Sequence, residues 1–259
     1  MSNELTGELA EGDTQGDVNV VMVVVRRVRK RLHYVDRDGM AIFEGDIVLG
    51  KTATIAGAGA SFLPMGSGIS GDQYRWPRGV VPYEIALGLP SPTRVKEAVA
   101  HWNGKTKLKL VERTGANAAN LPDYVVFQPG SGCSSYVGRQ GGAQAISVGP
   151  TCTVGNLIHE IGHAIGLWHE QSREDRQTYV TINWENIAEK NRHNFEQHIV
   201  DGDDLGNYDY ESIMHYPAWA FSKNGSPTIV PKQAKPIGQR KALSAGDLAA
   251  VKMLYPEIH

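Results

Sequence analysis

The stretch that most constrains this chain is LIHEIGHAIGLWHEQ, from Leu157 to Gln171. It holds three histidines and two glutamates among leucine, isoleucine and alanine. Residues four apart share one face of a helix, so His159 and His163 would point the same way. Two imidazoles at this spacing can bind one metal ion. The segment therefore predicts a helix that begins near Thr151 or Thr153 and carries a metal site.

Gly166 lies where this helix would end, because glycine readily adopts the backbone conformation that lets the chain turn. The turn would bring His169 back to the first two imidazoles. Three neutral imidazoles leave one position open on the ion, which is typical of a catalytic zinc site rather than a structural one. Chance would produce H-E-x-x-H-x-x-G-x-x-H on the order of 0.0001 times in such a chain. We therefore predict one zinc ion, bound by His159, His163 and His169.

Glu160 follows the first of these histidines and supplies the remaining chemistry. Zinc lowers the pKa of a bound water and polarises a scissile carbonyl. Glu160 can accept the proton of that water and pass it to the leaving amine. The predicted reaction is amide hydrolysis with Glu160 as general base. The other histidines lack ligand spacing and are expected to be structural or solvated: His33, His101, His193, His198, His215 and His259.

Composition is compatible with one large domain or two small ones. The chain has 259 residues, of which 41% are hydrophobic and 21% charged. A net charge of −2 suggests neither a nucleic-acid nor a membrane partner. The longest apolar run, Val18 to Val25, is too short to span a bilayer. The basic run RRVRKR, Arg26 to Arg31, is a processing site, a phosphate-binding patch or, as we favour, a solvated strand.

The amino-terminal third differs in character from the rest. Residues 1–16 are polar and acidic, and we expect disorder there. Val18 to Leu32 indicates a strand or hairpin arm, followed by a turn at DRDG, Asp36 to Gly39. A small-residue, glycine-rich stretch then predicts a flexible activation linker over residues 56–70.

Strands are predicted early in the remaining chain, at GVVPYEIAL, LKLVER, DYVVFQPG and GAQAISVG. One helix should start after Ser91 as its cap, with Pro92 in the first turn. The last helix should start with a capping box formed by Ser244 and Asp247. Early strands and late helices predict an α+β fold.

At this point the chain resembles the astacin family of metzincin peptidases. The zinc motif continues as EQSREDR, and SIMHYP, Ser212 to Pro217, is similar to the family's Met-turn. VKEAVAHWNGKTKLKLVERT and SGCSSYVGRQGGAQAISVG also resemble astacin segments, so the likeness covers about residues 67–259. It implies two lobes separated by a cleft. The upper lobe would hold two helices and a twisted sheet with mostly antiparallel edges, and the irregular lower lobe would carry the C-terminal helix.

The resemblance also implies roles for single residues. Met214 would form the apolar floor beneath the three histidines. Tyr216 would be a further zinc ligand in the resting enzyme and would swing away to stabilise the oxyanion. Glu170 would be buried and would receive the new amino terminus after activation.

The two cysteines are, by themselves, compatible with two unrelated buried thiols. The resemblance instead pairs Cys133 with Cys152, as one of the family's two usual disulfides. The second bridge is missing, since Lys107 stands where a cysteine is expected. A disulfide over this loop contributes roughly 3 kcal/mol. One bridge instead of two weakens the inference of an oxidising compartment.

FEGD, Phe43 to Asp46, resembles the F-x-G-D latency motif of astacin pro-segments. There Asp46 would bind the zinc in place of the catalytic water, and Gly45 would let the backbone approach closely. Glu44 would also contact the active-site region. A carboxylate is a good zinc ligand. The alternative is an ordinary Gly-Asp turn after a strand. The valine-rich arm is expected to pair with the sheet edge of the catalytic domain.

Counting back from Trp76 along the family pattern predicts cleavage near Gly66–Ser67. The chain would then divide into an inhibitory pro-segment, residues 1–66, and a peptidase domain, residues 67–259. The activating protease would be another enzyme or the chain itself.

We therefore predict a latent zinc endopeptidase that acts on proteins or peptides as a monomer. One alternative is a catalytically silent zinc-binding protein of the same fold. Another is a pro-segment that is a permanent inhibitory or targeting domain. No signal peptide is visible at the start of the chain, so it was removed, export follows another route, or the protein stays inside. We expect secretion, because an unrestrained peptidase is hazardous inside a cell.

Overall fold

The computed structural model describes residues 16–25, 28–57, 71–197 and 204–259. The predictions of disorder over residues 1–16 and of a linker over 56–70 lie almost wholly outside these ranges, as does Ser67. The main element is a nine-stranded sheet in the order β1-β2-β3-β4-β8-β9-β7-β5-β6. Its strands are β1 (Val18–Val25), β2 (Val28–Arg37), β3 (Met40–Phe43), β4 (Ile47–Lys51), β5 (Val80–Ile85), β6 (Lys109–Glu112), β7 (Tyr124–Pro129), β8 (Ser134–Ser135) and β9 (Ala143–Val148).

The catalytic half of the sheet is mixed, which agrees with the predicted α+β fold. Strands β6, β5, β7 and β9 are parallel, and β8 alone runs antiparallel to β9. The prediction of mostly antiparallel edges is therefore wrong at the β6 edge. The physical reason is that helix α2 joins β5 to β6, and such a crossover returns the chain in the parallel direction.

The chain also forms three longer helices: α2 (Thr93–Lys105), α3 (Val154–Ile165) and α4 (Ala245–Leu254). Ser244 and Asp247 form the predicted capping box of α4. Ser91 does not cap α2, because it adopts a left-handed φ of 52° before Pro92, which takes the N-cap position itself. An N-cap residue is typically extended, so the left-handed φ of Ser91 is what removes it from the cap position.

Strands β1–β4, from the amino-terminal region, extend the half of the sheet that residues 80–148 form. β1 pairs with β2, and Asp36 accepts the amide of Gly39 (3.1 Å) in the predicted turn between β2 and β3. β3 and β4 form a second hairpin, and helix α1 (Thr52–Gly57) follows. The prediction that the valine-rich arm meets the catalytic sheet is wrong, since β1 is the outer edge. Contact is made by β4 instead, which pairs in parallel with β8 at Ile47 and Ser135.

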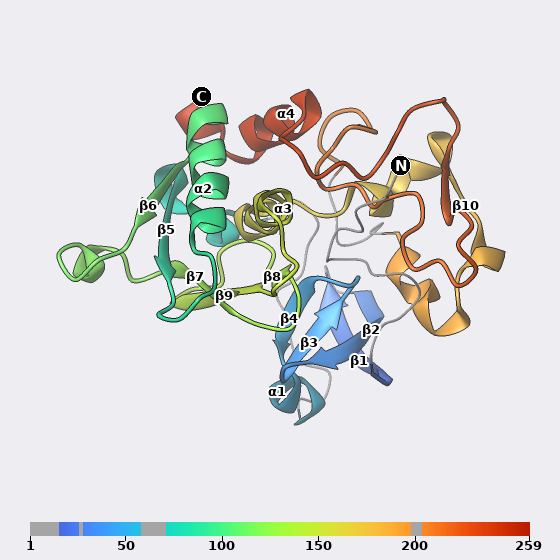
Figure 1. Ribbon diagram of the computed structural model, residues 1–259, viewed down its shortest axis with the longest axis horizontal. Helices are drawn as coiled ribbons and strands as arrows, with labels where there is room; N and C mark the ends of the chain where they lie inside the picture. Colours follow the sequence, from blue (N-terminus) through green and yellow to red (C-terminus); the bar gives the residue numbers. More distant parts are fainter. Residues whose placement is uncertain (1–15, 26–27, 58–70, 198–203) are drawn as a thin grey trace.

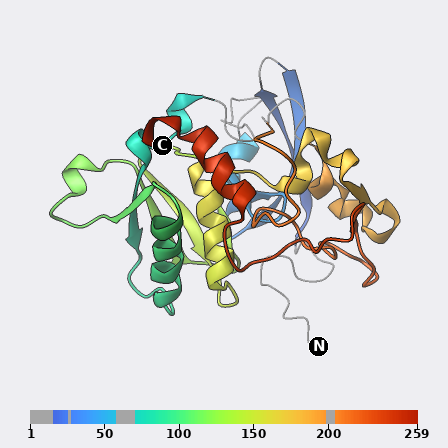
Figure 2. The ribbon, with the colours of Figure 1, turned by 90° about the horizontal axis from the view of Figure 1, so that it is seen from above.

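The arrangement places α3 in the middle of the molecule (Figures 1 and 2). The parallel strands and α2 lie on one side of it, and β1–β4 lie below it in Figure 1. On the other side is a lobe of short turns around the two-stranded sheet of β10 (Val180–Ile182) and β11 (Ile229–Pro231). Within the described ranges, every helix is too short or too polar to cross a membrane.

Candidate metal centre

The predicted helix of the zinc motif is α3, and its ends follow from local chemistry. The Thr153 hydroxyl accepts the amide of Asn156 (3.2 Å), while the Asn156 side chain accepts the amide of Thr153 (2.8 Å). Gly166 ends the helix with a left-handed φ of 113°, and the Leu167 amide turns back to the Gly162 carbonyl (2.9 Å). This turn leads the chain directly to His169.

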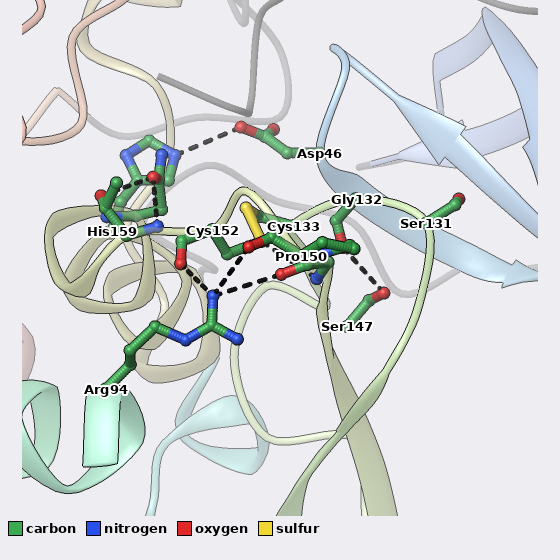
Figure 3. Close-up of a disulfide and its surroundings, with 12 residues drawn as sticks. Asp46, Arg94, Ser131, Gly132, Cys133, Ser147, Pro150, Cys152 and His159 are labelled. Carbon is green, nitrogen blue, oxygen red and sulfur yellow. Dashed lines mark hydrogen bonds and ion pairs between the residues drawn. A yellow bond between two sulfur atoms is a disulfide. The ribbon is translucent and has the colours of Figure 1, made fainter. Parts of the chain in front are cut away.

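Four buried side chains meet at one point beside α3. Atoms Nε2 of His159, His163 and His169 lie 3.3, 3.7 and 3.1 Å from carboxylate oxygens of Asp46. The four ligand atoms all lie within 4.8 Å of one another. Asp46 comes from the turn between β3 and β4, and Figure 3 shows its carboxylate directed towards the histidine cluster. The structure thus brings together residues more than a hundred positions apart.

The geometry and tautomers of this cluster fit a zinc ion. Two ligand atoms about 2.0–2.1 Å from a tetrahedral ion lie roughly 3.3 Å apart, and the Nε2 atoms lie 3.1–3.7 Å from the Asp46 oxygens. Nδ1 of His159 donates to the Ile213 carbonyl and Nδ1 of His163 donates to the Leu167 carbonyl, each at 2.8 Å. Their Nε2 atoms therefore carry lone pairs. Both are buried and make no hydrogen bond among the described residues, as metal ligands would.

The charge state of the cluster also favours a bound cation. Burial acts to raise the pKa of Asp46, but the charge of His169 and the close side chains of His159 and His163 hold it well below its usual range. Burial and the two neighbouring imidazoles lower the pKa of His163 well below its usual value, so it stays neutral. Burial also acts to lower the pKa of His169, but Asp46 and Glu44 outweigh it and raise that pKa to about 9. The carboxylates thus hold a positive charge at Nε2 of His169, either a proton or a metal ion.

The two residues expected to act in catalysis are both buried beside the cluster. Glu160 lies on α3 next to His159 and is fully buried. The Tyr216 hydroxyl donates to the backbone carbonyl of Glu44 in the pro-segment. Its ring lies against that of His169, with centroids 4.6 Å apart. The tyrosine is therefore engaged by a residue of the amino-terminal region, and Asp46 is the fourth side chain of the possible metal-binding group.

The Met-turn packs directly on the ligand helix. A Cβ added at Gly162 would lie 2.6 Å from Sδ of Met214, so glycine is needed for this close approach. The turn is anchored from α4, because Asp247 accepts both the Ser212 hydroxyl (2.6 Å) and the Ile213 amide (3.0 Å). The sequence pattern predicted only the capping role of Asp247, because its contact with residues 212 and 213 is distant in the chain.

Glu170 lines a cavity behind the third histidine. Its carboxylate accepts the amide of Asp209 (2.7 Å) and lies 3.8 Å from Nε of Arg173. Met214 and Asp247 line the same cavity. Burial raises the pKa of Glu170 to about 8, against the lowering effect of Arg173 and the Asp209 amide.

Cys133 and Cys152 form a disulfide, as the resemblance implies (Figure 3). Cys133 precedes strand β8, which lies between β4 and β9, and Cys152 precedes α3. Arg94 of α2 donates to the carbonyl of Pro150 (3.3 Å) in the same loop. The bridge therefore ties the strand that contacts the pro-segment to the helix that carries the ligands.

The pro-segment motif is held by its own packing. Phe43 packs edge-on against Trp168, with ring centroids 6.3 Å apart. Gly45 has a φ of 82°, in the left-handed region that favours glycine. The Ser135 amide donates to the Asp46 carbonyl (2.9 Å), which fixes the ligand's backbone on β8.

Two residues at the site, Gln171 and Ser172, were not predicted from the sequence, and Glu44 was predicted only to contact the active-site region. The Gln171 side chain accepts the Tyr216 amide (3.0 Å). Glu44 accepts Nδ1 of His169 (2.9 Å) and the Ser172 hydroxyl (3.1 Å). The only sequence signal was position, since Gln171 and Ser172 follow the third histidine and Glu44 lies inside the FEGD motif.

A helix that backs the mixed sheet directs two histidines and a neighbouring glutamate to one point. A third histidine follows a glycine turn. This is the architecture of a zinc metallopeptidase.

Comparison with known proteins identifies the family. The model of the astacin peptidase family matches residues 68–256. The chain is 39% identical over 194 residues to blastula protease 10 of Paracentrotus lividus, covering 71% of this chain and 32% of that protein. It is 42% identical over 187 residues to zinc metalloproteinase nas-13 of Caenorhabditis elegans, covering 70% of this chain and 41% of that protein.

A solved structure of a zinc-protease is also similar to this chain. High choriolytic enzyme 1, a hatching enzyme zinc-protease from the medaka Oryzias latipes, superposes with a TM-score of 0.63 at 38% identity, over 70% of this chain and 92% of that one. The chain belongs to the astacin family of peptidases, and the prediction of a zinc metalloendopeptidase is confirmed at the level of the family. The match spans 32% and 41% of the length of the two curated relatives named above.

Proposed function

We propose that this chain is a latent zinc endopeptidase that hydrolyses peptide bonds in proteins. One observation carries the proposal: a carboxylate from the amino-terminal region, Asp46, lies 3.1–3.7 Å from the Nε2 atoms of all three histidines. In this proposal His159, His163, His169 and Asp46 hold one zinc ion in the latent form. Residues 1–66 act as an inhibitory pro-segment, and residues 67–259 form the peptidase.

The catalytic chemistry follows from the residues around the ligand atoms. Zinc, when bound, supplies a Lewis acid that polarises the scissile carbonyl and acidifies the attacking water. Glu160 accepts the proton of that water and delivers it to the leaving amine. Tyr216, once released from the Glu44 carbonyl, donates its hydroxyl to the oxyanion that forms at the scissile carbonyl. While the pro-segment is docked, Asp46 excludes the water and Tyr216 is occupied, so neither group can act.

Activation is proposed to occur by cleavage near Ser67, by another protease or by the chain itself. The cavity beside Glu170 supports a role for that carboxylate in receiving the new amino terminus. A buried ammonium group there would pair with Glu170, whose charged form burial disfavours. Met214 would remain the apolar support of α3 throughout.

Substrates are proposed to be proteins or peptides, and the chain is proposed to act as a monomer. The disulfide between Cys133 and Cys152 supports an extracellular location, because such bonds persist in oxidising compartments.

The test compares casein hydrolysis by residues 1–259 and by residues 67–259, each with and without a zinc chelator. We expect only the shorter chain to cut, and the chelator to stop it. Asp46→Ala in the full chain should then release activity. If neither chain cuts although both hold zinc, the protein is a catalytically silent zinc binder. If no fresh amino terminus ever forms near Ser67, the first 66 residues are a permanent domain.

A further inference from the structure

The three histidines differ in what holds the back of each ring. Nδ1 of His159 bonds to the carbonyl of Ile213 and Nδ1 of His163 to that of Leu167. Both carbonyls belong to the catalytic region itself. Among the residues that the structure describes, the acceptor facing Nδ1 of His169 comes instead from the pro-segment. It is the Glu44 carboxylate, at 2.9 Å.

Glu44 is firmly placed for this contact. Its side chain is fully buried, and its second oxygen accepts the Ser172 hydroxyl at 3.1 Å. Its backbone adopts a φ of 47°, an uncommon conformation for a residue with a side chain. The turn thereby directs two carboxylates, those of Glu44 and Asp46, to opposite nitrogens of the same imidazole.

A carboxylate behind a ligating imidazole fixes the ring and its tautomer and makes the other nitrogen more basic. Loss of such a partner typically weakens metal binding 10–100-fold. We propose that Glu44 is a positioning residue for His169, so that the docked pro-segment both blocks the zinc and tightens its binding. The inference rests on the proposed function, namely that the cluster holds zinc and that residues 1–66 depart. It means that the chain binds zinc most tightly while latent.

The test measures zinc transfer from the intact full chain to a chromogenic chelator. Glu44→Ala should release zinc roughly 10–100-fold faster than the wild type. Glu44→Gln should fall between them, because an amide oxygen still accepts the Nδ1 hydrogen but carries no charge. Glu97→Gln removes the same charge from the exposed face of α2 and should release zinc at the wild-type rate.

Proton NMR of the zinc-loaded chain separates positioning from simple undocking. The three imidazole N–H resonances should be assigned first. Both Glu44 variants should shift or lose the His169 resonance and leave those of His159 and His163 in place, while the full chain still fails to cut casein. If all three resonances move together and the chain becomes active, Glu44 only docks the pro-segment and the inference is overturned.

Two further outcomes separate a failure of this inference from a failure of the proposed function. If wild type holds one zinc per chain and Glu44→Ala releases it at the same rate, the inference about Glu44 fails and the proposed function stands. If wild type holds no zinc at all, the proposed function fails and the inference fails with it.

Discussion

The catalytic region and the pro-segment bring ligand atoms to the same point by opposite means. The catalytic region uses α3, a 12-residue helix whose spacing sets His159 and His163 on one face and whose own surroundings hold their rings. The pro-segment uses a short turn in which Glu44 and Gly45 both have positive φ values, of 47° and 82°. In the proposed function, the regular helix provides a site that persists, while the turn, docked on one strand, provides a block that can leave. The following predictions test that difference.

The largest effect should come from Glu160→Gln in material cleaved near Ser67. Glutamine cannot accept the proton of the attacking water, so the rate of peptide hydrolysis should fall by roughly 10²–10⁴-fold. Zinc content, measured by atomic absorption, should stay at one per chain because the three imidazoles remain. Loss of zinc together with activity would mean that Glu160 supports the site rather than the reaction.

The next effect should come from weakening the turn of the pro-segment. Gly45→Ala places a side chain in the left-handed region, which costs about 1–2 kcal/mol and should raise leak activity of the uncut chain roughly 5–30-fold. Gly39→Ala is the matched control, because Gly39 also has a positive φ (77°) but lies at the far turn of the same sheet. Casein hydrolysis by the intact chain is the measurement, and equal leak from both variants would contradict a specific lock at Gly45.

A smaller effect is expected from the contact between α3 and the Met-turn. Gly162→Ala would bring a methyl group to 2.6 Å from Met214 and should lower the free energy of unfolding of the zinc-loaded chain by about 1–3 kcal/mol. Gly104→Ala on α2, where an added Cβ meets nothing within 4 Å, should not destabilise. Urea unfolding measures both. Equal free energies of unfolding for the two variants would mean that the Met-turn moves aside for the methyl group without loss of stability.

The smallest effect concerns the pH dependence of the contact between strand β2 and the lobe that contains His193. His33 of β2 and the buried His193 have ring centroids 5.3 Å apart, and Nδ1 of His33 lies 3.9 Å from Glu196. Burial and the neighbouring His33 lower the pKa of His193 to about 4, although Glu44 acts to raise it. Because the pKa of His193 is lowered in the folded chain, the stability that depends on this residue is fully present above pH ~6.5 and is lost as the pH falls towards 4.

NMR titration of the His193 ring checks this directly. The wild-type chain should titrate near pH 4. His33→Asn removes the facing imidazole, so the pKa of His193 should rise towards its ordinary value. An unchanged pKa would show that burial within the lower lobe alone sets it.

Much of the fold followed from patterns within a few residues. The caps at Thr153 and Ser244, the glycine end of α3 and the strands β5, β6, β7 and β9 were all predicted, because capping and side-chain periodicity act over one or two turns. The error at Ser91 was local as well, since the residue adopts a left-handed φ instead of the extended backbone of an N-cap. The direction of β6 was missed because it depends on where α2 returns the chain.

By itself, the sequence determined the ligand set, the neighbouring glutamate and the turn that returns His169, since their spacing is local. The resemblance then indicated the motif that carries Asp46. Tertiary structure alone decided that β4 rather than β1 meets the catalytic sheet, and which groups hold each imidazole from behind. Glu44 and His169 are 125 positions apart. No periodicity links residues at that distance, so only the packing of one region against the other could place a carboxylate at the back of the third imidazole.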